Sequence, residues 1–333
     1  MHDETLSGKP IRDLRLAIDG TPLAPILARF QGEFIEAGLT RVKPRFYLST
    51  EWGVPFETVA LAIPFFLARP DLADFHLQRT GHIEGTDAED ILRYLRHELG
   101  HVVNYAYRLY DEPEWVQLFG AITQPYRDQY SPEPFSRRFV WHLPGWYAQK
   151  HPDEDWAETF AVWLTPGREW RRDYGAWPIA LGKLAYCERV IARVGDLEPP
   201  VTDDALDEPV TDIDYSIREL YDRIEPEPLE LPPGIDGALA AVAGDLAPVP
   251  GEATTRVAAR LRALELTLVG QIYRWTGHLP EHTKSLVAHA VGLAEARELA
   301  FAARHDQAFV VGVTALLTSL ALNHVRAGSY LPE

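Results

Sequence analysis

The last hundred residues carry the clearest periodic pattern in the chain. Apolar side chains recur at steps of three and four, which predicts one buried helix face, at Val257, Leu261, Leu264, Leu268 and Ile272. Pro280 can begin a second helix, because proline is well tolerated at the first helical position. A third, mostly apolar helix is expected over residues 307–325. Residues 235–333 are therefore predicted to form an all-helical C-terminal domain.

The first part of the chain has a mixed pattern. Residues 12–38 predict a short strand followed by a helix, and β-branched and aromatic runs over residues 45–50 and 58–68 predict strands. From about residue 87 to residue 194 the spacing of apolar residues becomes helical. Strands followed by helices indicate an α+β fold for residues 1–194.

Residues 195–234 differ in composition from both flanking parts. They hold 13 acidic residues, 2 basic residues and 7 prolines, a net charge of −11. Such a segment has little apolar surface to bury, so we predict an acidic, proline-rich linker. A short helix around residues 215–224 is expected to interrupt it.

Composition narrows the classes of function. The chain has 49 acidic and 32 basic residues, a net charge of −17, so phosphate backbones should repel it and nucleic acid is not an expected partner. Cys187 is the one cysteine, which fits a reducing compartment and a small core residue. No secretory signal is expected in the first residues, MHDETLSGKP. The apolar run over residues 308–322 is shorter than a membrane span, so we predict a cytoplasmic protein without a membrane partner.

The segment TDAEDILRYLRHELGHVVNYAYRL carries the candidate chemistry. The pair Thr86 and Glu89 predicts a capping box at the start of a long helix. His97 and His101 are four residues apart and therefore lie on one face of that helix. In this His-Glu-x-x-His pattern two imidazoles bind one zinc ion, and Glu98 beside them acts as the base.

A catalytic zinc usually has a third protein ligand, which we expect downstream in HPDEDWAETF. Glu154 and Glu158 lie one helical turn apart, so one carboxylate can bind zinc while the other orients a zinc-bound imidazole. Glu154 is the first candidate for the ligand, with Glu158 and His151 as alternatives. The preference of a first helical turn for acids explains Asp153 and Glu154, but explains Glu158 less well.

Two segments resemble known metallopeptidases. HELGHVVNYAYRL and HPDEDWAETFAVWLTPG resemble the bacterial zinc-binding metallopeptidase family. The pair HELGH and EDWAE is similar to the gluzincin pattern of thermolysin and anthrax lethal factor. The resemblance covers about residues 10–194 and implies a zincin-like domain, whereas residues 235–333 resemble no module.

The resemblance also implies roles for single residues. It makes His97, His101 and Glu154 the zinc ligands, with Glu98 as the general base and Glu158 as the outer acid that orients a ligand. Tyr147 lies seven residues before Glu154 and matches the tyrosine that faces the reacting carbonyl in lethal factor. Tyr126, Tyr130 and His142 are alternatives to Tyr147 for stabilising the oxyanion.

These features predict a zinc-dependent peptidase that binds one zinc per chain and hydrolyses peptide or protein substrates. In this mechanism zinc lowers the pKa of its bound water, and Glu98 accepts the proton of the water. Two alternatives remain: a zinc amidase acting on a small or modified peptide, and a zincin-like binding protein without turnover. His278 and His282 flank Leu279-Pro280, which makes a shared helix face unfavourable, so we predict solvated surface histidines there.

Overall fold

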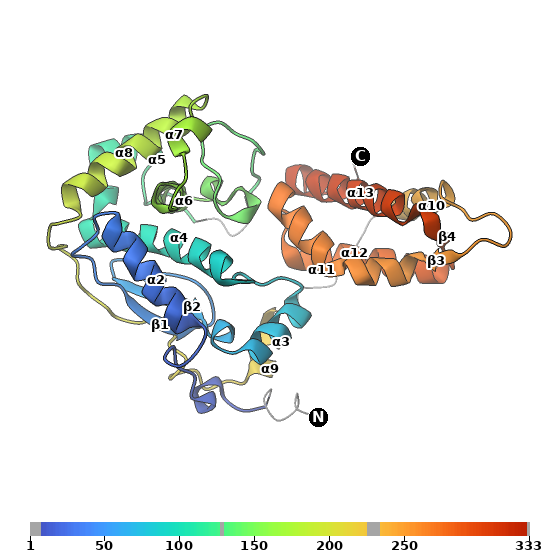
Figure 1. The fold of residues 1–333 in the computed structure, drawn as a ribbon, viewed down its shortest axis with the longest axis horizontal. Helices are drawn as coiled ribbons and strands as arrows, with labels where there is room; N and C mark the ends of the chain where they lie inside the picture. Colours follow the sequence, from blue (N-terminus) through green and yellow to red (C-terminus); the bar gives the residue numbers. More distant parts are fainter. Residues whose placement is uncertain (1–7, 127–129, 225–233, 332–333) are drawn as a thin grey trace. The chain divides into compact units, whose positions relative to one another are not determined.

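The computed structural model describes residues 8–126, 130–224 and 234–331. The chain forms two compact units: Met1–His76 with Ile83–Ile224, and Leu77–His82 with Glu225–Glu333. Figure 1 shows the elements of both units.

The first unit combines a small sheet with several helices, which confirms the predicted α+β class (Figure 1). Its elements, in chain order, are η1 (Ile11–Leu14), α2 (Leu23–Glu36), β1 (Arg45–Ser49), β2 (Ala60–Pro64), η2 (Phe65–Ala68), α3 (Pro70–Thr80), α4 (Ala88–Tyr107), η3 (Leu109–Asp111), α5 (Pro113–Phe119), η4 (Pro144–Gln149), α6 (Pro152–Leu164), α7 (Trp170–Asp173), α8 (Pro178–Val194) and α9 (Ile217–Ile224). Helix α3 continues into the segment grouped with the second unit.

The predicted strands over residues 45–50 and 58–68 correspond to β1 and β2, which pair in parallel with Arg45 opposite Ala60. The second strand is shorter than predicted, because residues 65–68 form the 3₁₀ helix η2. All five residues of β2 are buried, as expected for an uninterrupted apolar run. The strand predicted at the start of residues 12–38 is wrong. A 3₁₀ turn, η1, stands there, in which the Asp13 N–H donates to the Pro10 carbonyl at 3.0 Å, and the N–H groups of Ile11 and Arg12 donate to the carbonyls of Tyr215 and Ile213.

Helices α4 and α6 form the centre of the first unit. Gly100 of α4 faces α6 so closely that an added Cβ would stand 2.8 Å from the Cα of Ala157. The Trp156 indole N–H donates to the Gly100 carbonyl at 2.8 Å, which fixes the same contact. Only a residue without a side chain allows this approach, and the approach brings the two segments with the candidate metal ligands together.

Residues 195–224 pack onto the first unit, so the predicted linker is wrong over that part. The backbone N–H of Val59 donates to the Asp203 carbonyl at 2.7 Å, and that of Val210 to the Leu48 carbonyl at 2.9 Å. Apolar side chains spaced along the segment are buried: Val201, Val210, Ile213, Ile217 and Tyr221. The acids between them are mostly exposed, which is why composition alone suggested a linker. Residues 225–233 lie outside the described part.

The second unit is built from α10 (Ile235–Gly244), α11 (Val257–Thr276), α12 (Pro280–Ala296) and α13 (Asp306–Ala327). Three of these correspond to the predicted helices, and Figure 1 shows them packed side by side. The all-helical prediction needs one correction, because β3 (Thr254–Arg256) pairs antiparallel with β4 (Ala300–Ala302). This short pair joins the start of α11 to the segment before α13.

One helix among the described residues, Ala303–Ala327, is long and apolar enough to cross a membrane by length and composition. This is weak evidence, because helices in the core of a globular unit pass the same criteria. Here one face is buried in the core of the second unit through Phe309, Val313 and Leu317. The absence of a membrane partner stays a prediction.

A buried ion pair supports the side of α6 that faces α8. Lys183 Nζ lies 2.5 Å from Asp155 Oδ2 and donates to the Arg138 carbonyl at 3.0 Å, and both charged side chains are buried. Cys187, one turn later on α8, is also fully buried, which confirms it as a core residue.

We expect Lys183→Met to destabilise the first unit by about 3–5 kcal/mol, because it leaves the Asp155 carboxylate buried without its partner. Urea denaturation followed by tryptophan fluorescence measures this, since every tryptophan except Trp275 lies in the first unit. The matched control is Arg189→Met, which breaks an exposed pair with Glu114 and should cost less than about 1 kcal/mol. Equal losses of unfolding free energy in the two variants would contradict a stabilising role for the buried Lys183–Asp155 pair.

Candidate metal centre

Helix α4 begins one residue later than the capping pattern suggested. The N-cap is Asp87, whose carboxylate accepts from the Asp90 backbone N–H at 3.0 Å. Asp90 in turn accepts from the N–H of Thr86 at 3.0 Å. The predicted box of Thr86 and Glu89 is therefore wrong, because Asp90 takes the reciprocal role and Glu89 pairs with Arg29. The helix still runs through the whole His-Glu-x-x-His motif.

Three side-chain atoms from α4 and α6 converge in the buried centre of the first unit. His97 Nε2 lies 3.2 Å from His101 Nε2 and 3.0 Å from Glu154 Oε2, and His101 Nε2 lies 3.3 Å from the same oxygen. The structure thus brings together the three residues predicted as ligands. His97 and Glu154 are 57 positions apart in the sequence and meet because α4 and α6 pack against each other.

This group fits a metal ion. A tetrahedral ion with ligand distances of about 2.1 Å separates its ligand atoms by about 3.4 Å, close to the distances observed here. Two imidazole nitrogens and one carboxylate oxygen are also a donor set that catalytic zinc sites use. The group of His97, His101 and Glu154 could therefore hold a metal ion.

Each histidine of the group has an acid on its outer nitrogen. His97 Nδ1 lies 3.0 Å from Glu158 Oε1, and the Glu158 carboxylate also accepts from the backbone N–H groups of His142 and Leu143. His101 Nδ1 lies 3.0 Å from Asp153 Oδ2. The hydrogen bond with Glu158 fixes the tautomer of His97 and points its Nε2 at the candidate metal position. The His101–Asp153 contact has the distance of an ion pair without the geometry of a hydrogen bond.

Asp153 is the residue that the sequence analysis missed. It was explained by the helix dipole, yet its carboxylate also accepts from Asn104 Nδ2 at 2.7 Å and from the Tyr105 hydroxyl. Asn104 and Tyr105 lie three and four residues after His101, so they share the face of α4 that meets α6. Polar residues at that spacing were the available signal.

The charges of the group are strongly coupled. Burial lowers the pKa of His97, but hydrogen bonds with Glu154 and Glu158 outweigh it and raise the pKa to about 9. Burial opposes ionisation of Glu154, but His101 and His97 hold its pKa well below the ordinary value. Glu98 is buried beside the group without belonging to it, and burial raises the pKa of Glu98.

Two tyrosines border the group. The Tyr147 ring packs edge-on against His97 with 5.6 Å between ring centroids. The Tyr126 hydroxyl donates to Glu154 Oε1 at 2.8 Å and lies 3.3 Å from the Tyr147 hydroxyl. Tyr147, the first candidate for stabilising the oxyanion, and Tyr126, one of its alternatives, therefore both reach the site.

The remaining alternatives have other partners. The Tyr130 hydroxyl donates to the Gly145 carbonyl at 2.7 Å, and His142 Nε2 lies 2.9 Å from the Arg93 carbonyl. His151 caps α6, accepting from the Asp153 N–H at 3.2 Å, while its Nε2 lies 2.9 Å from the Gln124 carbonyl. None of these three belongs to the group around His97.

We expect Gly100→Ala to weaken metal binding and to lower the free energy of unfolding by about 1–3 kcal/mol, because the methyl group forces α6 away from α4. Isothermal titration with zinc and urea denaturation measure the two effects. Gly182→Ala on α8 is the control, since a Cβ there meets nothing within 4 Å and should stabilise the helix. Unchanged zinc affinity in Gly100→Ala would show that the close approach does not position the ligands.

The surface prediction is wrong for His278, whereas His282 is partly exposed. His278 is buried, and its ring lies 5.8 Å from that of His282 and 5.2 Å from that of His324 between centroids. Burial, followed by the two neighbouring imidazoles, lowers the pKa of His278 to about 3. Pro280 begins α12, as predicted, and the non-helical residues 277–279 fold His278 back over the first turn of that helix, where its Nδ1 lies 2.7 Å from the Thr283 hydroxyl.

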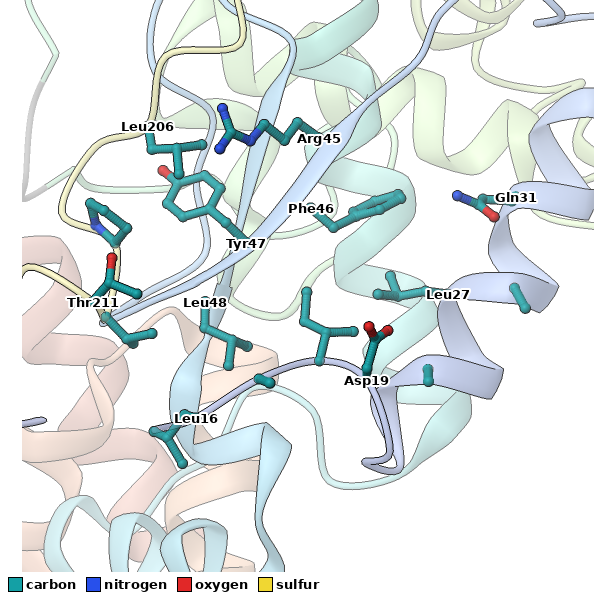
Figure 2. Close-up of a pocket in the computed structure, with 16 residues that line it drawn as sticks. Leu16, Asp19, Leu27, Gln31, Arg45, Phe46, Tyr47, Leu48, Leu206 and Thr211 are labelled. Atoms are coloured by element: carbon teal, nitrogen blue, oxygen red, sulfur yellow. The ribbon is translucent and has the colours of Figure 1, made fainter. Parts of the chain in front are cut away.

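A pocket of about 620 Å³ lies elsewhere in the first unit, between the segment before α2, strand β1 and residues 206–211. Figure 2 shows Asp19, Tyr47 and Arg45 among its lining residues. No lining residue belongs to the group around His97.

The chain matches no protein-family model, no curated protein and no solved structure.

Proposed function

We propose that the first unit is a zincin-like, zinc-dependent peptidase, related to the bacterial zinc-binding metallopeptidases and acting in the cytoplasm. The observation that carries the proposal is the convergence of His97 Nε2, His101 Nε2 and Glu154 Oε2 within 3.3 Å of one another. Three protein ligands leave one tetrahedral position open for water or substrate, which is the arrangement of catalytic zinc.

Zinc held by these ligands would lower the pKa of a bound water and polarise the carbonyl of a peptide bond. The residues of the chain supply the remaining steps. Glu98 lies in α4 next to His97 and is not one of the ligands, so its carboxylate is available to accept a proton from the water. The same carboxyl group then donates that proton to the leaving amine, which keeps the proton balance of hydrolysis.

The tyrosines stabilise the negative charge that develops on the carbonyl oxygen. Tyr147 packs on His97, and its hydroxyl is a donor at the border of the site. Tyr126 already donates to Glu154, so its part is to orient that ligand and, through the 3.3 Å contact, the Tyr147 hydroxyl. Because the Tyr126 proton goes to Glu154, the Tyr147 hydroxyl donates to Tyr126 in this contact and turns its proton to the oxyanion during the reaction.

Hydrolysis of a mixed peptide library, followed by mass spectrometry, tests the proposal. We expect cleavage by the zinc-loaded protein, loss of cleavage after removal of zinc with a chelator, and recovery on adding zinc. Cleavage that persists in chelator would contradict a zinc peptidase. Zinc-dependent capture of peptides without cleavage would favour the binding protein, and turnover restricted to small amides would favour the amidase.

A further inference from the structure

The second unit holds a separate cluster of three histidines, drawn from the end of each of three helices. His278 follows α11, His282 lies in the first turn of α12, and His324 lies in the last turn of α13. One ligand atom from each lies within 4.8 Å of the other two. From this convergence we infer that the second unit binds a divalent transition-metal ion, zinc foremost, at a site independent of the peptidase centre.

The hydrogen bonds of His278 prepare its outer nitrogen for a metal. The Thr283 hydroxyl directs its proton at backbone carbonyls, those of Leu279 at 3.1 Å and His278 at 3.3 Å. Nδ1 of His278 lies 2.7 Å from this hydroxyl oxygen, and when the hydroxyl proton serves the carbonyls Nδ1–H is the donor. That tautomer leaves Nε2 unprotonated, the arrangement that outer partners impose on metal-binding histidines.

The lone pair of His278 Nε2 points toward Tyr330, whose hydroxyl lies 3.0 Å away. The Tyr330 ring stacks on His324 with 4.4 Å between centroids, so the phenol forms one wall of the cluster. A metal ion at Nε2 would replace this hydrogen bond and would have the phenol oxygen beside it. His282 and His324 are partly exposed, which leaves the position open to solvent.

The spacing requires small movements on binding. Nitrogen ligands of tetrahedral zinc stand about 3.4 Å apart, so the histidines must close from separations of up to 4.8 Å. Rotation of the two partly exposed side chains can supply this. Three imidazoles without a carboxylate favour zinc, copper or nickel over calcium or magnesium, which prefer oxygen ligands.

The site would tie together distant parts of the second unit. His278 and His282 hold the connection between α11 and α12, and His324 holds the end of α13. A bound ion would stabilise these segments, because ligands brought together only by folding make binding part of the folding free energy. The role inferred is therefore structural.

Zinc bound per full-length chain, measured by mass spectrometry after equilibrium dialysis, tests the inference. We expect about two zinc ions in the wild type and about one in His282→Gln and in His324→Gln, because glutamine removes one imidazole ligand. His289→Gln, also on α12 and outside the cluster, is the matched control and should keep both. Hydrogen exchange over residues 277–290 and 322–331 should slow on adding zinc to the wild type, and not to His324→Gln.

The outcomes separate this site from the peptidase centre. One zinc in the wild type and none in His324→Gln would support this site and contradict the centre at His97. Equal zinc contents in the wild type and both variants, with no change in hydrogen exchange, would overturn the inference and leave a hydrogen-bonded histidine cluster.

Discussion

Glu98→Gln should bind zinc as tightly as the wild type and hydrolyse peptides about 10²–10⁴-fold more slowly. Glutamine keeps the size of the side chain but cannot accept the proton of the attacking water. The ligand atoms belong to His97, His101 and Glu154, so their positions should not change. Steady-state hydrolysis and zinc titration on the same preparation measure both quantities.

The matched control is Glu89→Gln, which makes the same chemical change in the exposed first turn of the same helix. It should keep full activity, because Glu89 pairs only with Arg29 among the contacts that we observe. A Glu98→Gln variant that retains turnover would remove Glu98 from the mechanism. A variant that loses zinc together with turnover would make Glu98 part of metal binding.

The second large effect concerns the division of roles between Glu154 and Glu158. Glu154→Gln should lower zinc affinity by more than 100-fold, because it weakens a direct ligand, whereas Glu158→Gln should cost about 10–100-fold. The difference follows from the contacts: Glu154 lies 3.0 Å from His97 Nε2, and Glu158 lies 3.0 Å from Nδ1 on the opposite side of the ring. Competition titration with a chromophoric chelator resolves both affinities.

The informative result is which of the two variants loses more zinc affinity. A larger loss in Glu158→Gln would exchange the ligand and the orienting acid, which was the alternative left open by the sequence. Asp153→Asn extends the same test to His101, and it should resemble Glu158→Gln, since Asp153 faces the outer nitrogen His101 Nδ1.

Local rules were enough to predict which three residues the structure brings together as a possible metal site. The four-residue spacing of His97 and His101 places them on one helix face whatever the tertiary structure. Predicting Glu154 as the third residue required one further assumption, that a second helix turns its acidic first turn toward the two histidines. The strands β1 and β2 could also be predicted from local sequence, because their runs of apolar residues favour buried extended segments.

The errors came from contacts between distant segments. Residues 195–224 look solvated by composition, yet backbone hydrogen bonds such as that of Val59 to Asp203 hold them on the first unit. The histidine cluster depends on how the connection before α12 folds and on where α13 ends, neither of which the spacing of residues 278 and 282 contains. Asp153 was attributed to the helix dipole because its partner, His101, lies 52 residues earlier in the chain.

The most direct test of the account is the zinc content of the chain with the second cluster removed. Full-length His324→Gln and the double variant His324→Gln with His97→Ala would be dialysed against zinc and compared by mass spectrometry. The account predicts about one zinc per chain in the single variant and none in the double variant. No zinc in the single variant, or equal zinc in both, would contradict a metal centre at His97, His101 and Glu154.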